Sequence, residues 1–401
     1  MSPYTAKKSS SIMVLFTITY MISYITRINF GAILTELESA TGFSRTLLSV
    51  SITGSFVTYG LGQILSGILG DKFHPKTMVR NGLVITTLMN CLIPFCKSPY
   101  TMAIFWCCNG FAQSMMWPPL VRYMTALFSA EEYKVASTRV NWGASFGTII
   151  VYFAAPFLIG WFGYTGVFFT SAGLGLAMTL LWVVAAPDFS PATPKKKQEQ
   201  TATKTGRLFP CFMILILLAI LCQGMLRDGV TTWMPTYIAD TYSLENGVAI
   251  LTGVILPLFS IGSLWLSGKL YQTKCQNPVT CGAIFFGVGG LSALSLFFFT
   301  GKAAALSVLF SALLTGCMHG VNLMLVCMVP AFFKNSGKVS TVSGIINACT
   351  YVGSALSTYG IALISQTKGW NTTILVWTGI ALLGTVLCLI ALPAAKKQWQ
   401  T

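Results

Sequence analysis

The first long apolar segment of the chain contains the stretch Tyr20-Met-Ile-Ser-Tyr24-Ile-Thr-Arg27-Ile-Asn29-Phe-Gly31. An arginine at the centre of a membrane-spanning helix costs roughly 2.5 to 3.5 kcal/mol on insertion scales. The segment that opens the second half repeats this feature in Leu221-Cys-Gln-Gly224-Met-Leu-Arg227-Asp228-Gly229. More than two apolar turns precede each arginine, which argues against the alternative that their long side chains snorkel to the interface. We therefore interpret Arg27 and Arg227 as an anion-binding pair, one from each half.

The composition is that of a protein that crosses the lipid bilayer many times. The 401 residues are 54% hydrophobic and 9% charged, whereas soluble domains carry about 25% charged residues. The formal net charge of +15 raises the question of nucleic-acid binding. However, the basic residues fall in short gaps between apolar segments, as the positive-inside rule predicts, rather than in a stripe with aromatic residues. We therefore exclude nucleic acid as a partner.

The twelve cysteines and two histidines do not predict a disulfide framework or a metal site. Most of the cysteines lie inside apolar runs, where they act as small hydrophobic residues. We expect no cofactor. The first apolar segment is too long for the core of a signal peptide and lacks a small-residue cleavage site, so we interpret it as the first spanning helix.

Apolar windows of about 20 residues predict twelve transmembrane helices in two sets of six. The predicted spans are 12–34, 46–70, 77–96, 100–128, 134–160 and 164–186, followed by 208–240, 247–271, 278–300, 303–333, 339–364 and 370–393. The segment between the sets has the proline, lysine and glutamine content of a solvated linker. The expected organisation is an N-terminal half (1–186), a cytoplasmic linker (187–207) and a C-terminal half (208–401).

Lysine and arginine residues fall mainly on one side of this topology, which predicts that both termini and the linker are cytoplasmic. We expect a multi-pass protein of the cell inner membrane.

The two sets of helices resemble each other. Gly62-Gln-Ile-Leu-Ser66-Gly67 in the second helix matches Gly262-Ser-Leu-Trp-Leu-Ser267-Gly268 in the eighth, and Asn141 in the fifth matches Asn347 in the eleventh. Small residues occur at any transmembrane helix interface, so each match alone is weak. Together with the two arginines, they predict two parallel six-helix repeats with a site at the midplane between them.

The loop after the second helix, Gly67-Ile-Leu-Gly-Asp71-Lys72-Phe-His-Pro-Lys76, resembles the major facilitator signature of a glycine, Asp-Arg and a trailing basic residue. In this chain Lys72 replaces the usual arginine. We expect Asp71 to cap the start of the loop and to pair with basic side chains. Asp71, Lys72 and Lys76 are the predicted gating residues of a cytoplasmic latch that breaks when the halves rock.

Within that superfamily, the chain resembles the organophosphate:phosphate antiporters, which exchange glycerol 3-phosphate and hexose 6-phosphates. The resemblance covers nearly the whole chain and implies an all-α major facilitator fold. Four stretches carry it: Tyr24-Ile-Thr-Arg27-Ile-Asn29-Phe30, Gly110-Phe-Ala-Gln113-Ser-Met-Met-Trp117-Pro118-Pro119-Leu-Val-Arg122, Leu226-Arg227-Asp228-Gly229 followed by Trp233-Met-Pro235-Thr236-Tyr237, and Tyr351-Val-Gly353.

The resemblance implies that Arg27 and Arg227 hold the phosphate. Two guanidinium groups can present planar forks to a tetrahedral dianion and form bidentate, charge-assisted hydrogen bonds. Tyr24 and Tyr20 lie one and two turns before Arg27 on the same helical face, so their hydroxyl groups are candidates to bind the same anion.

The chain also departs from the glycerol-3-phosphate exchangers around this clamp. Where they carry a histidine, a lysine and a tyrosine, this sequence has Ala144, Gln63 and Gly224. His319 stands where they carry a tyrosine. The predicted pocket is therefore rebuilt, and glycerol 3-phosphate is a doubtful substrate.

The remaining candidate pocket residues each have a second interpretation. Asp228 is predicted to screen Arg227, to carry a proton, or to contact a cationic group of the substrate. His319 either lines the pocket or is satisfied by a neighbouring carbonyl. Asn141, Trp142 and Tyr351 either line the pocket or pack between helices, and Gln63 is a further candidate pocket residue.

These features predict a monomeric secondary transporter that exchanges a small phosphorylated metabolite for inorganic phosphate by alternating access. The alternatives are a proton- or sodium-coupled symporter of carboxylates or other organic anions, and a transporter-like sensor of a phosphorylated metabolite. The expected partner is thus a small anion, either a phosphate ester or a carboxylate. We do not expect an enzyme, because the sequence shows no nucleophile–base arrangement and no phosphate-binding Gly-x-x-x-x-Gly-Lys-Ser/Thr motif.

Overall fold

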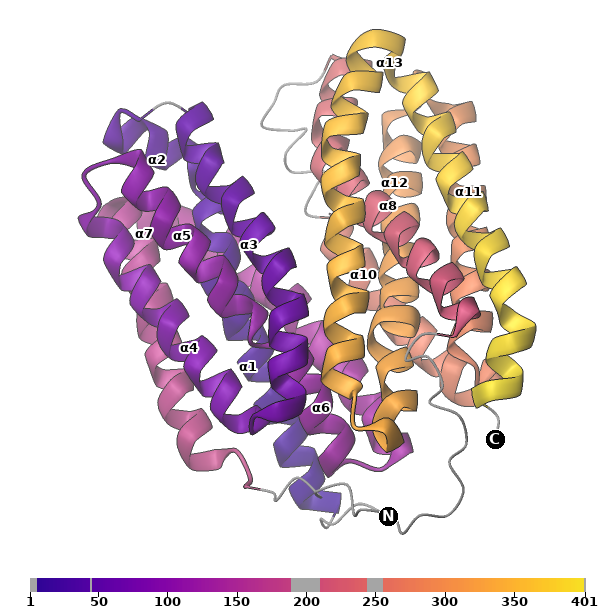
Figure 1. The fold of residues 1–401 in the computed structure, drawn as a ribbon. Helices are drawn as coiled ribbons and strands as arrows, with labels where there is room; N and C mark the ends of the chain where they lie inside the picture. Colours follow the sequence, from indigo (N-terminus) through magenta and orange to yellow (C-terminus); the bar gives the residue numbers. More distant parts are fainter. Residues whose placement is uncertain (1–5, 44, 189–209, 244–254, 400–401) are drawn as a thin grey trace. The chain divides into compact units, whose positions relative to one another are not determined.

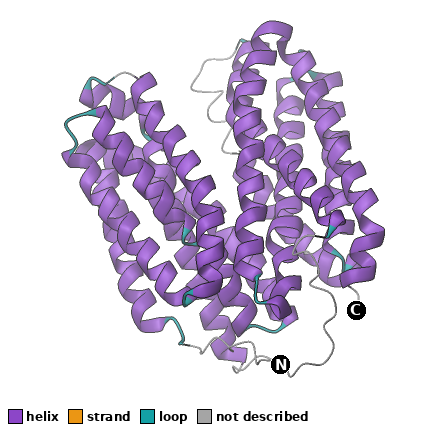
Figure 2. Cartoon of the chain, viewed as in Figure 1, coloured by secondary structure: helices purple, strands orange, loops and turns teal. Residues whose placement is uncertain are grey.

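The computed structural model describes residues 6–43, 45–188, 210–243 and 255–399. These residues are almost entirely helical and include no β-strand (Figure 2). Contacts divide the chain into two compact units, Met1–Pro191 with Phe333–Ala348, and Ala192–Phe332 with Cys349–Thr401. The predicted linker lies almost wholly outside the described residues, so the predicted domain boundaries stay a prediction.

Most of the first unit comes from the first half of the chain (Figure 1). Its helices are α1 (Ala6–Ala32), α2 (Leu34–Thr41), α3 (Arg45–Lys72), α4 (Pro75–Leu92) with the 3₁₀ turn η1 (Ile93–Phe95), α5 (Pro99–Ser114), α6 (Trp117–Leu127) and α7 (Ala130–Ala185).

Two details of this unit differ from a simple run of spanning helices. The predicted span 100–128 is broken between α5 and α6, because Pro118 and Pro119 occupy the first turn of α6 and cannot donate hydrogen bonds to a preceding turn. The predicted spans 134–160 and 164–186 instead follow each other without a loop. Gly163, at φ 66° and ψ −173°, makes the turn between them.

The second unit contains α8 (Cys211–Tyr242), α10 (Ile255–Leu270) with η2 (Tyr271–Cys275), α11 (Pro278–Phe299) and α12 (Ala304–Val321). The chain continues from α12 through the π-helical segment η3 (Asn322–Met328) and the 3₁₀ segment η4 (Val329–Ser336). The last helix, α13 (Val339–Trp399), begins in the first unit and is interrupted at Gly369, at φ 79°. The start of the predicted span 247–271 lies outside the described residues.

Nine helices of the described part of the chain are long and apolar enough to cross a membrane. One of them, Ala130–Ala185, accounts for two predicted spans. The predicted spans 100–128 and 247–271 are missing from this count. They correspond to the shorter helices α5 and α6, and to α10. Each of the twelve predicted spans therefore has a helical counterpart.

Glycine residues bring the helices that carry the two arginines into backbone contact with their neighbours. A Cβ atom on Gly147 of α7 would lie 2.6 Å from the carbonyl oxygen of Met21 in α1. In the second unit, a Cβ atom on Gly353 of α13 would overlap with the carbonyl oxygen of Leu221 in α8. The two contacts occupy matching places in the predicted repeats, and each one leaves no room for a side chain.

We expect Gly147→Ala and Gly353→Ala each to destabilise the protein by about 1–3 kcal/mol, because the new methyl group must push a backbone carbonyl away. The measurement is thermal unfolding of the purified protein in detergent. Gly160→Ala is the matched control on α7, since its Cβ would have no described neighbour within 4 Å. Equal unfolding temperatures for all three variants would contradict the backbone contact.

Candidate functional site

Arg27 is surrounded by aromatic rings in the first unit. Its Cζ atom lies 4.1 Å from the centre of the Tyr24 ring and 4.8 Å from that of Tyr59 in α3. The Tyr24 ring packs edge-on against Tyr20, with 5.2 Å between ring centres, and Tyr20 in turn packs on Trp117. A cation over the face of an aromatic ring is stabilised by about 0.5–2 kcal/mol.

Tyr59 was not among the residues predicted from the sequence. It lies four residues before Gln63 on α3 and therefore on the same helical face. That spacing is the signal that could have identified it.

The opposite face of α1 is fixed by buried polar side chains. Asn29 Nδ2 donates hydrogen bonds to Asn90 Oδ1 at 2.8 Å and to Ser171 Oγ at 3.0 Å. Asn29 and Gln113 belong to two of the stretches that carry the family resemblance, and both side chains are buried in this network. These two residues therefore contribute to holding the helices together.

Gln113 joins α1 to α4 and α5. Its Nε2 donates to the hydroxyl oxygens of Thr26 and Thr86, at 2.9 and 2.8 Å, and its Oε1 accepts a hydrogen bond from Ser23. One face of α1 thus holds the helix in place, while the other presents Tyr20, Tyr24 and Arg27.

Gln63 is fully buried on α3, and neither its Oε1 nor its Nε2 has a hydrogen-bond partner among the described residues. Buried amides are nearly always satisfied, so an orphaned one needs a water molecule or a ligand. Its place in the pocket stays a prediction.

The other two candidates of this unit lie side by side on α7. Asn141 Nδ2 donates to the carbonyl oxygen of Ser137 in its own helix at 2.9 Å. The indole nitrogen of Trp142 is a second buried donor that has no described acceptor.

Arg227 forms a two-point ion pair with its neighbour Asp228 in the second unit. Nε lies 2.6 Å from Oδ1, and Nη2 lies 2.8 Å from Oδ2. Nη1 donates to Asn322 Oδ1 at 3.0 Å, and Ser354 Oγ donates to Asp228 Oδ2 at 2.5 Å. The predicted pairing of Asp228 with Arg227 is therefore present in the structure.

Asn322 and Ser354 were not singled out from the sequence. Asn322 is the first residue of the π-helical segment η3, and such widened turns occur frequently at functional sites. Ser354 lies three residues after Tyr351 on α13 and bonds across to α8. A hydrogen-bond partner on another helix cannot be recognised from the spacing of residues in the sequence. Asn322 does lie three residues after His319, and therefore on the same face of its helix.

His319 Nδ1 lies 3.0 Å from the carbonyl oxygen of Thr315 and 3.1 Å from Ser260 Oγ. A neighbouring carbonyl thus satisfies this histidine, as the second interpretation expected. His319 also lies close enough to Asp228 to interact with it electrostatically. Tyr351 is half-buried on α13.

Asp71 caps the start of α13. Its Oδ1 accepts the backbone N–H of Ser340 at 2.9 Å, and its Oδ2 accepts that of Thr341 at 2.8 Å. A carboxylate is stabilised at this position by the orphan N–H groups and by the helix dipole. Arg122 Nη1 donates to the carbonyl oxygens of Gly70 and Phe73 and so closes the turn around Asp71.

The other two predicted gating residues lie nearby. Lys72 is exposed in the last turn of α3. Lys76 pairs with Asp188 at 3.0 Å.

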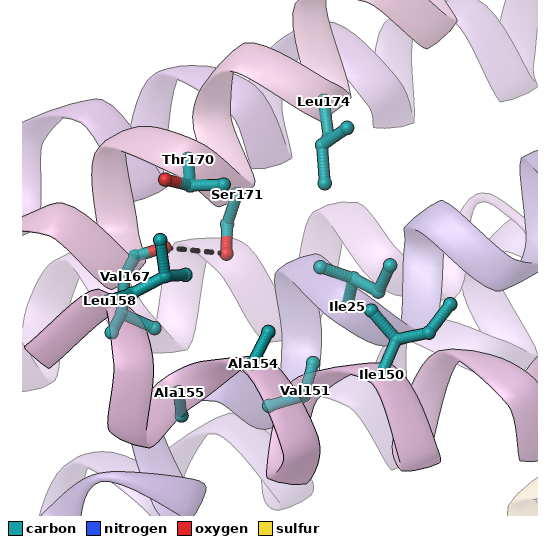
Figure 3. Close-up of a pocket in the computed structure, with 10 residues that line it drawn as sticks. All are labelled: Ile25, Ile150, Val151, Ala154, Ala155, Leu158, Val167, Thr170, Ser171 and Leu174. Atoms are coloured by element: carbon teal, nitrogen blue, oxygen red, sulfur yellow. Dashed lines mark hydrogen bonds between the residues drawn. The ribbon is translucent and has the colours of Figure 1, made fainter.

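Two cavities, one in each unit, lie away from these residues. Figure 3 shows an apolar cavity of about 40 Å³ in the first unit, lined by Ile25 of α1 and by side chains of α7 that include Val151 and Leu174. A shallow cavity of about 310 Å³, open to the surface of the second unit, is lined by residues that include Lys368 and Trp370. Neither cavity is lined by a predicted site residue.

Residues 16–358 match the family model described as the Major Facilitator Superfamily. The chain belongs to this superfamily. A probable hexose phosphate transport protein of Chlamydia muridarum is 23% identical to it over 88% of this chain and 84% of its own length. The membrane sensor protein UhpC of Salmonella typhimurium is 23% identical over 96% of this chain and 91% of its own length. The glycerol-3-phosphate transporter of Bacillus subtilis is 23% identical over 96% and 90%.

The fold is shared with the fucose:proton symporter FucP of E. coli, with a TM-score of 0.77 at 13% identity over 96% of this chain and 99% of that one. The predicted fold and the resemblance to the organophosphate:phosphate antiporters are therefore confirmed. The protein is a multi-pass membrane transporter by family, and its relatives are not enzymes.

Replacing Gln113 by methionine keeps the size of the side chain and removes its hydrogen bonds. We expect a loss of about 1–3 kcal/mol of stability, because Ser23, Thr26 and Thr86 lose a buried partner. Thermal unfolding measures this loss, and Gln272→Met at an exposed position is the control that should stay within about 0.5 kcal/mol. If the two variants unfold alike, Gln113 does not hold α1.

Proposed function

We propose that this transporter exchanges a small phosphorylated metabolite for inorganic phosphate by alternating access, with the anion bound by Arg27 and Arg227. It would act in the inner membrane with both termini in the cytoplasm. The observation that carries the proposal is a pair of guanidinium groups, one in the first helix of each half. Aromatic rings hold one of them in place, and a carboxylate and an amide hold the other.

Two guanidinium groups suit a phosphate for a geometric reason. A guanidinium can present a planar fork of N–H donors to a pair of oxygens, and a phosphate has enough oxygens for two such groups. A ligand shared by the two halves would stabilise the occluded state, since only that state offers both arginines together. The hexose phosphate and glycerol-3-phosphate relatives support this class of substrate.

A sensor of a phosphorylated metabolite is the second candidate, because one relative is a membrane sensor protein. A sensor binds its ligand without moving it across the membrane. Exchange of labelled phosphate in proteoliposomes separates the two functions: a transporter loads label against internal phosphate, and a sensor does not.

We expect Arg27→Lys and Arg227→Lys each to weaken phosphate binding, although both keep the positive charge, because lysine cannot form the bidentate fork. The loss of such a partner costs about 2–5 kcal/mol, which is roughly 30- to several-thousand-fold in affinity. Titration of the purified protein with inorganic phosphate measures it. Arg80→Lys, at an exposed position, is the matched control. Wild-type affinity in both site variants would exclude the shared clamp.

Titration of the purified protein with a phosphate ester and uptake into proteoliposomes, both at several pH values, distinguish the alternative symporter. A phosphate ester becomes a dianion above its second pKa of about 6, so affinity should rise with pH across this range. A proton-coupled carboxylate symporter would instead lose uptake as the pH rises and its driving gradient falls.

The cap that Asp71 forms on α13 supports a gating role for this residue. Asp71→Asn removes the charge that stabilises the helix start, a contribution of about 0.3–2 kcal/mol. We expect the rate of phosphate exchange in proteoliposomes to change more than the equilibrium affinity. Asp188→Asn, which breaks the exposed pair with Lys76, is the control and should leave both unchanged. A collapse of affinity at an unchanged exchange rate would show that Asp71 does not gate.

A further inference from the structure

The Arg227–Asp228 pair determines which charges a ligand can bring to the second unit. We propose that this pair selects a zwitterionic ligand, an organic phosphate or phosphonate that carries an ammonium group, and that Asp228 binds the ammonium. The inference rests on the function proposed above and specifies the class of substrate.

The guanidinium of Arg227 is largely covered. Asp228 occupies Nε and Nη2, Asn322 occupies Nη1, and only 14% of the arginine side chain is exposed. A ligand that approaches this position therefore meets a guanidinium whose charge is already balanced by a carboxylate.

Asp228 is the more accessible member of the pair, with 32% of its side chain exposed. Its two oxygens accept hydrogen bonds from Nε and Nη2 of Arg227 and from Ser354 Oγ. The described residues supply three hydrogen bonds, and a carboxylate has about four acceptor positions, so a donor from a ligand can use the fourth. An ammonium group supplies up to three N–H donors and the opposite charge, which makes it the best match for this position.

Ser354 holds the carboxylate in place for this contact. Its hydroxyl bonds to Asp228 Oδ2 and also lies 3.0 Å from the carbonyl oxygen of Thr350 in its own helix. Ser354 is therefore a positioning residue, which orients Asp228 without contact with the ligand.

The net charge of the proposed site also favours a zwitterionic ligand. Arg27, Arg227 and Asp228 together carry one net positive charge. A phosphate ester dianion with one ammonium group carries one net negative charge, whereas a simple ester dianion carries two and brings its excess charge close to the exposed carboxylate. The aminated ligand therefore neutralises the site and avoids that repulsion.

A pair of compounds that differ in one group tests the inference. 2-Aminoethyl phosphate and 2-hydroxyethyl phosphate have the same length, and both can donate hydrogen bonds, but only the first carries the positive charge. We expect wild-type protein to bind the amino compound at least tenfold more tightly in calorimetric titrations at pH 7.5. This comparison needs no variant, so it does not depend on the folding of a mutant.

Asp228→Asn should reduce the preference to threefold or less, because the amide keeps the shape and loses the charge. Ser354→Ala should reduce the preference by a smaller factor. Asp240→Asn is the matched control, since this carboxylate also lies on α8 but accepts a hydrogen bond from Trp370 near the C-terminal end of the helix. It should keep the full preference.

Two results would overturn the inference. If wild-type protein binds both compounds equally, or if Asp228→Asn keeps the tenfold preference, Asp228 does not select an ammonium group. Binding of inorganic phosphate and of the hydroxyl compound would then leave the proposed function standing. If no phosphate compound binds, both proposals fail.

Discussion

The cost of placing a guanidinium in the apolar interior governs the arrangement of both units. A membrane-embedded arginine has to be surrounded by groups that replace water, and this chain uses two different solutions. The rings of Tyr24 and Tyr59 lie against the guanidinium of Arg27, whereas Asp228 and Asn322 accept hydrogen bonds from that of Arg227. The two arginines occupy matching positions in the predicted repeats, yet their chemistry differs, because ring faces leave a cation its net charge and a carboxylate cancels it.

Much of the fold follows from hydropathy, because an apolar window of about 20 residues has few alternatives to a spanning helix. Hydropathy does not show where the backbone departs from a regular α-helix. The window at 100–128 is continuous, but Pro118 and Pro119 divide it into two helices, and the window at 303–333 passes through π-helical and 3₁₀ turns after Val321. These deviations depend on hydrogen-bond geometry and not on how apolar the residues are.

The sequence identifies those residues of the candidate site that are energetically costly in an apolar segment. Arg27, Arg227 and Asp228 are visible because charge is expensive in an apolar run. Tyr59, Asn322 and Ser354 are ordinary residues for a transmembrane helix, and they became site residues only through contacts with another helix. Asn29 and Gln113 belong to stretches that resemble the family, but their buried hydrogen bonds give them a structural role.

The glycine contacts of Gly147 and Gly353 have a mechanical consequence. A contact between a backbone carbonyl and a bare Cα has no side chain that can rotate to absorb a displacement, so we expect it to resist sliding of one helix past the other. A force exerted on Arg27 would pass along α1 to α7 at the contact between Met21 and Gly147. A force exerted on Arg227 would pass along α8 to α13 at the contact between Leu221 and Gly353. In each unit, force applied at the arginine would therefore spread to a second helix within one or two turns of its point of application.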